Sequence, residues 1–131
     1  MRAARPRTFG DDTGKVHVRP ETDNIVAISL EGEFDRANSF LISEQAEQAL
    51  DEDKHLILDL SGASFIDSST IHALVQAQNA AAKQGQVIVL QLGTAATVER
   101  ALQLSGIDQL VPRAGTRGEA VQTLQRLAQS S

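Results

Sequence analysis

The chain has 131 residues, 41% of them hydrophobic, which is enough to bury one aliphatic core in a single compact domain. Its 12 basic and 17 acidic residues give a net charge of −5, and this acidic balance argues against direct binding to nucleic acid. The absence of cysteine excludes disulfides and thiolate metal sites, and no apolar run approaches the roughly 20 residues that cross a bilayer. We therefore expect a soluble, cytoplasmic, single-domain protein without a membrane partner.

The first 14 residues differ in character from the rest of the chain. They combine Arg, Pro, Thr, Gly and Asp without apolar periodicity, a composition typical of a disordered segment. Residues 1–20 carry five basic side chains against two acidic ones. We predict a disordered basic tail at 1–14, ahead of a domain at 15–131. The tail is either a passive extension or a contact to an acidic partner or nucleic acid.

Two apolar patterns alternate after the tail. Short apolar runs predict strands at 15–20, 25–30, 55–60, 86–92 and 110–113, the first two forming a hairpin. Apolar stripes at 3.6-residue spacing predict helices at 37–50, 68–84, 94–104 and 116–128, with a loop at 61–66. Gly85 and Gly106 are predicted to end the second and third helices. Strands that alternate with helices indicate an α/β fold with largely parallel pairing, and the hairpin makes the sheet mixed.

The segment Asp67-Ser68-Ser69-Thr70 stands where the predicted loop enters a helix. Oxygens of Asp, Ser and Thr accept hydrogen bonds from the first free N–H groups of a helix, so capping alone is one interpretation. The other is a phosphoacceptor site, because a phosphate is well tolerated at the positive end of a helix. A phosphate there would be repelled by Asp67 and Asp35 and would change partner binding without refolding the domain.

The sequence contains few features that support catalysis or the binding of a cofactor. His72 lies three residues after Ser69, but a serine hydrolase also needs an orienting acid and an oxyanion hole, and no Gly-x-Ser-x-Gly elbow is present. No metal-ligand spacing, Walker A motif or Gly-x-Gly-x-x-Gly motif occurs. We predict that the protein is not an enzyme and uses no metal or cofactor, with His72 on the surface or in a groove.

Acidic residues are concentrated between residues 21 and 53. This segment carries ten acids against one base, Arg36. It is either a docking face for a basic partner, because complementary charge steers encounter, or an ordinary solvated surface.

Four segments of the chain resemble the bacterial anti-sigma factor antagonists of the STAS domain family (sulfate transporter and anti-sigma factor antagonist). Residues 65–69 (Phe-Ile-Asp-Ser-Ser) resemble the phosphorylation motif, and residues 30–35 (Leu-Glu-Gly-Glu-Phe-Asp) resemble the Gly-Glu-Leu-Asp segment of that family. Residues 56–61 resemble its central strand, and residues 98–107 resemble its third helix and the following turn. The resemblance covers about residues 15–127.

The resemblance implies a small mixed sheet of four to five strands with about four helices packed mainly on one side. It also implies that the unphosphorylated protein binds an anti-sigma factor that is a serine kinase of the GHKL type, which releases a sigma factor. The kinase would phosphorylate Ser69, with Ser68 and Thr70 less favoured, and a PP2C-type phosphatase would restore the protein. The alternative is a non-switching STAS scaffold or a subunit of a larger signalling or transport complex. A switch protein is expected to be a monomer or small dimer.

The family pattern also implies a partner-binding surface. Asp35 matches the family acid that lies near the acceptor, and Asp67 matches the acid that begins the turn. The expected surface comprises Gly32, Glu33, Asp35, Asp67, Ser68, Ser69, Thr70 and His72. The family most often has Gly at the position of Thr70, whose bulk and hydroxyl imply either a different partner or modification of Thr70 itself.

Overall fold

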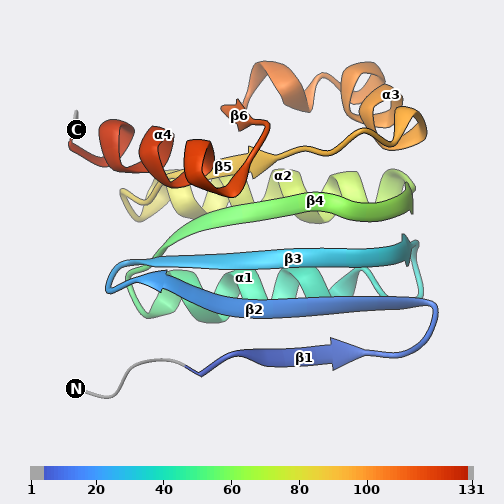
Figure 1. Ribbon diagram of the computed structural model, residues 1–131, viewed down its shortest axis with the longest axis horizontal. Coiled ribbons are helices and arrows are strands. Elements are labelled where there is room, and N and C mark those ends of the chain that lie inside the picture. Colours follow the sequence, from blue (N-terminus) through green and yellow to red (C-terminus); the bar gives the residue numbers. More distant parts are fainter. Residues whose placement is uncertain (1–4, 130–131) are drawn as a thin grey trace.

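The computed structural model describes residues 5–129 as a mixed α/β domain with one six-stranded sheet (Figure 1). The strands are β1 (Arg7–Gly10), β2 (Gly14–Thr22), β3 (Ile25–Phe34), β4 (His55–Ile66), β5 (Ile88–Gln91) and β6 (Arg113–Ala114). The helices are α1 (Phe40–Asp51), α2 (Ser68–Lys83), α3 (Ala96–Ser105) and α4 (Arg117–Gln129), with a 3-10 turn at Ile107–Gln109. Sheet order follows the chain, with β2 antiparallel to its neighbours β1 and β3, and with β3 to β6 parallel.

This architecture confirms the predicted α/β fold, its mixed sheet and the positions of all four helices. The final strand lies slightly later than the predicted 110–113. Gly85 and Gly106 follow α2 and α3 with φ angles of 73° and 79°, the left-handed conformation expected of residues that end helices. Within residues 5–129, no helix combines the length and apolar character that crossing a bilayer requires.

The additional strand β1 corrects the prediction of a disordered tail at 1–14. Asp11 Oδ1 accepts a hydrogen bond from the backbone N–H of Thr13 at 2.9 Å, which forms a tight turn between β1 and β2. Phe9 then packs against the main core. One apolar residue among polar neighbours gives no alternating pattern, so the strand is apparent only once β2 is in place beside it. The part of the prediction that concerns residues 1–4 lies outside the described residues.

The predicted loop at 61–66 is also a strand, because β4 continues beside β3 to the end of both. Phe34 and Ile66 are register partners at the last position of the pair. Small and polar residues in this half of β4 suggested a loop, and pairing with β3 overrides that local preference. The chain therefore leaves two neighbouring parallel strands at one edge of the sheet, and this edge is the one that carries the candidate site.

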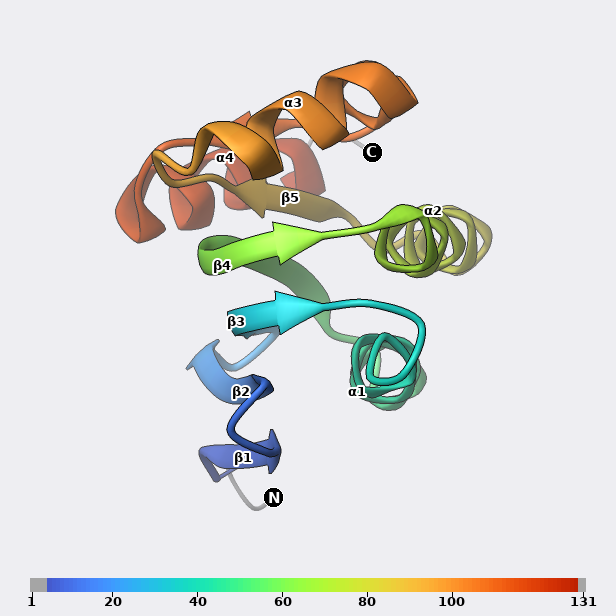
Figure 2. The same ribbon diagram turned by 90° about the vertical axis from the view of Figure 1, so that its right-hand side faces the viewer.

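The two faces of the sheet carry two separate apolar clusters. The larger cluster joins the sheet to α1, α2 and α3, whereas the smaller one places α4 on residues of β3, β4 and β5. Figure 2 shows α1 and α2 on one side of the sheet and α4 over the other. The prediction that the helices pack mainly on one side is confirmed, with α4 as the exception.

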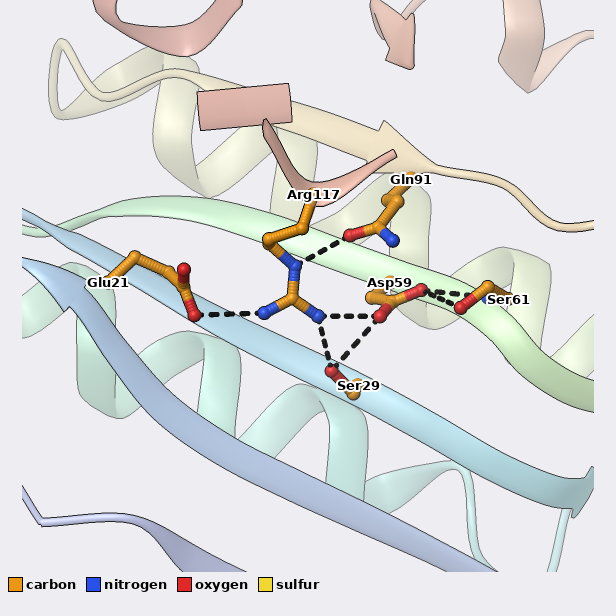
Figure 3. A network of polar contacts seen from close by, with 6 residues as sticks. All are labelled: Glu21, Ser29, Asp59, Ser61, Gln91 and Arg117. Carbon is orange, nitrogen blue, oxygen red and sulfur yellow. Dashed lines mark hydrogen bonds and ion pairs between the residues drawn. The ribbon is translucent and has the colours of Figure 1, made fainter. Parts of the chain in front are cut away.

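A polar network anchors the beginning of α4 to four strands (Figure 3). The Arg117 guanidinium donates hydrogen bonds to Asp59 at 2.6 Å, Glu21 at 2.9 Å, Gln91 at 2.6 Å and Ser29 at 3.0 Å. The Asp59 side chain is only 9% exposed, so its carboxylate depends on the Arg117 guanidinium to offset its lost hydration. No local sequence pattern indicates this network, because its members are spread over almost 100 positions of the chain.

Candidate functional site

Asp35 and Asp67 stand at the ends of two neighbouring strands, β3 and β4. Each directly follows one residue of the register pair Phe34 and Ile66. Figure 2 looks at this edge, where β3 leads into α1 and β4 leads into α2. In α/β sheets the carboxyl ends of parallel strands are the usual place for a functional site. The two acids that the sequence analysis singled out are thus brought to one edge.

Asp67 is the N-cap of α2, as the capping interpretation predicts. Its Oδ1 accepts hydrogen bonds from the backbone N–H groups of Ser69 at 2.9 Å and Thr70 at 3.1 Å. These bonds fix the first turn of α2 and hold Ser69 in place. Ser68 is exposed and Ser69 is half-buried. Neither serine hydroxyl has a hydrogen-bond partner within the part of the chain that the structure describes.

Thr70 points into the protein and adds no bulk to the surface. Its side chain is fully buried, and its hydroxyl donates a hydrogen bond to the carbonyl oxygen of Phe34 at 3.2 Å. The hydroxyl also lies 3.5 Å from Asp67 Oδ1. The structure therefore differs from the expectation that Thr70 meets the partner in place of the usual Gly, and the buried hydroxyl offers no access to a kinase.

Asp35 shapes the turn between β3 and α1. Its Oδ1 accepts a hydrogen bond from the Ala37 N–H at 2.8 Å, and its own N–H donates to Asn38 Oδ1 at 2.9 Å. Asp35 is exposed, and so is Glu33 two residues earlier. Both acids are therefore available to a partner at the edge where α2 begins.

Gly32 has a role in the packing of the backbone. Its φ of 96° is a conformation that side chains rarely adopt, and a Cβ there would lie 2.5 Å from the carbonyl oxygen of Thr13. The glycine thus lets the β1–β2 turn approach β3 closely. This packing brings the β1–β2 turn to the same edge as Glu33, whose N–H donates to the Thr13 carbonyl at 2.9 Å.

A groove of about 450 Å³ separates the beginnings of α1 and α2. It is lined by Arg36, Ser39, Phe40, Ser43, Ser68, Ser69, His72, Ala73 and Gln76. The predicted site residues Ser68, Ser69 and His72 meet here, whereas Asp35, Asp67, Thr70, Gly32 and Glu33 lie outside the lining. The prediction that His72 lies on the surface or in a groove is confirmed, because its side chain is exposed.

Two exposed aromatic residues near this edge were missed by the sequence analysis as site residues. Phe40 is 53% exposed and lines the groove, and Phe65 at the end of β4 is 46% exposed. Large apolar side chains at an exposed edge are typical anchors for a protein partner. The sequence signal that could have identified Phe40 as a site residue is its position outside the apolar stripe of its helix.

Comparison with known proteins identifies the family of this chain. Residues 18–120 match the STAS domain family, so the chain belongs to that family, as the four resembling segments predicted. No curated protein sequence matches the chain.

Several solved structures share the fold. An anti-sigma factor antagonist from Mycobacterium paratuberculosis is 21% identical, with a TM-score of 0.73 over 88% of this chain and 97% of that one. The unphosphorylated anti-sigma factor antagonist SpoIIAA is 22% identical, with a TM-score of 0.73 over 84% and 96%. Phosphorylated SpoIIAA from Bacillus is 22% identical, with a TM-score of 0.66 over 82% and 97%. At this level of identity the similarity establishes the fold.

Proposed function

We propose that this protein is an anti-sigma factor antagonist that binds its anti-sigma factor when unmodified and releases it when Ser69 is phosphorylated. The observation that carries the proposal is the placement of Ser69. Its backbone is fixed by Asp67, and it lines a groove beside an exposed Phe40. Antagonists of the same fold, one of them solved in both phosphorylation states, support this assignment.

The partner is an anti-sigma factor that is also a serine kinase of the GHKL type. The Ser69 hydroxyl attacks the γ-phosphorus of ATP held by the kinase, loses its proton, and expels ADP. A PP2C-type phosphatase hydrolyses the phosphate ester and returns the protein to its binding form. Ser69 is favoured over Ser68 by its position in the motif and over Thr70 because the Thr70 hydroxyl is buried and already donates to Phe34.

The docking surface combines aromatic anchors with acidic residues. Phe40 in the groove and Phe65 near the end of β4 are exposed and provide apolar contact area. Glu33 and Asp35 are exposed at the same edge and steer a basic partner surface toward it. A phosphate on Ser69 adds roughly −1.5 to −2 charges inside this contact, which turns it from favourable to unfavourable.

The switch is tested by using the unmodified full-length protein, two Ser69 variants and one control variant as bait in extracts of the native cells. Ser69→Ala is expected to retain GHKL-type kinases at the level of the unmodified protein or above, and Ser69→Glu to retain at least tenfold less, by quantitative mass spectrometry. Ser64→Ala serves as the matched control, because it removes an exposed serine hydroxyl outside the predicted partner-binding residues and is expected to bind normally. Equal retention of the same kinase by all forms would refute the switch.

A further inference from the structure

We propose that Arg36 forms an ion pair with the phosphate once Ser69 is modified, and that this pair within the chain closes the groove between α1 and α2. This inference rests on the proposed function and concerns how the modified state is held. It assigns to Arg36 a role for which the sequence patterns gave no indication.

The groove places Arg36 and Ser69 on facing elements. Arg36 belongs to the turn that precedes α1, Ser69 belongs to the first turn of α2, and both line the same space of about 450 Å³. Arg36 is exposed, and among residues 5–129 it has no ion pair or hydrogen bond from its side chain. An unpaired guanidinium is therefore already present where the phosphate would be added.

Charges around the groove favour this arrangement. Arg36 and His72 are the titratable side chains in the lining, which contains no carboxylate. The nearest acids of the site, Asp35 and Asp67, each direct Oδ1 at backbone N–H groups of their own turns. Repulsion by these two acids, expected from the sequence, is thus opposed by a cation on the groove side of Ser69.

Arginine suits this role chemically. Its planar guanidinium presents paired N–H groups that match two phosphate oxygens, and such charge-assisted bonds are among the strongest hydrogen bonds in proteins. A pair between Arg36 and a phosphate on Ser69 would run across the groove beside Phe40. The partner would then lose access both to the unpaired guanidinium and to the space that the partner's own side chain occupies in the groove. Phosphorylation would release the partner by filling the groove as well as by adding charge.

The test uses full-length protein with phosphoserine incorporated genetically at position 69, so that no kinase is needed. Phosphorus NMR follows the second ionisation of the phosphate, whose pKa is near 6. Because Arg36 favours the dianion, the pKa is expected to be higher in Arg36→Gln than in the parent protein by about 0.5 pH unit at low salt. The Arg36→Lys variant should recover part of the difference, since it keeps the charge without the paired donors.

Two controls keep the result specific. Arg100→Gln removes an exposed arginine from α3, away from the groove, and is expected to leave the pKa of the phosphate unchanged. His72 lines the same groove, so the comparison is repeated in His72→Gln, where the same Arg36-dependent difference is expected. Identical phosphate titrations with and without Arg36 in either background would overturn the proposal. That failure would leave the switch at Ser69 intact, because partner retention is measured separately.

Discussion

Thr70 joins the start of α2 to the end of β3 through a single hydrogen bond. Its hydroxyl donates to the Phe34 carbonyl, and its backbone N–H donates to Asp67. Because the side chain is fully buried, no water replaces a lost hydroxyl, and the Phe34 carbonyl would lose this donor. The same bond holds the turn that contains Asp35 at a fixed distance from Ser69.

At the residue scale, we predict that Thr70→Val lowers the free energy of unfolding by about 1 kcal/mol, because Val keeps the shape and removes the hydrogen bond. Thr70→Ser keeps the hydroxyl and removes a buried methyl group, so it measures the contribution of that methyl group separately. The chain has no Trp or Tyr, so urea unfolding is best followed by far-UV circular dichroism. Unchanged stability of Thr70→Val would mean that the Phe34 bond contributes nothing.

Helix α4 depends on a different kind of anchor from the other three helices. Its apolar contact is the smaller cluster, in which Ala120 and Leu124 are its buried residues, and its first turn is held by the Arg117 network. The carboxylate of Asp59 is nearly buried, so removing its cation leaves a charge with poor hydration. The guanidinium itself remains about one-third exposed, which moderates this cost.

At the element scale, we predict that Arg117→Gln destabilises the protein by about 2 kcal/mol, because hydrogen bonds to charged groups exceed neutral ones in strength. The loss should concentrate in α4, whose backbone amides should exchange with deuterium faster than those of α1 and α2. Arg100→Gln again serves as the control, with stability expected to change by less than about 0.5 kcal/mol. Equal exchange in all helices of Arg117→Gln would contradict the anchoring role.

The elements that the sequence revealed are those with a local signal. All four helices have apolar stripes, Gly85 and Gly106 follow α2 and α3, and β5 and the first half of β4 are apolar runs. The strand β1 and the second half of β4 have no such signal, because they exist through pairing with β2 and β3. Asp67 and Ser69 were identified from a local motif, whereas the groove with Arg36 and Phe40 depends on how α1 and α2 pack.

At the scale of the whole molecule, the proposed switch requires that the edge with Ser69 stays accessible to a partner. We therefore predict a monomer or small dimer, measured by size-exclusion chromatography with light scattering over a range of concentrations. Ser69→Glu should elute at the same position, since phosphorylation acts on a surface and leaves the fold unchanged. A large homo-assembly of the unmodified protein would favour the scaffold alternative over the switch.

The most direct test of the central claim is to map phosphorylation on the protein purified from its native cells, during growth and under stress, by mass spectrometry. We expect phosphate on Ser69, with an occupancy that changes between the two conditions. Phosphate confined to another residue, or none in any condition, would contradict the proposed switch and reduce the Asp67–Thr70 turn to a helix cap.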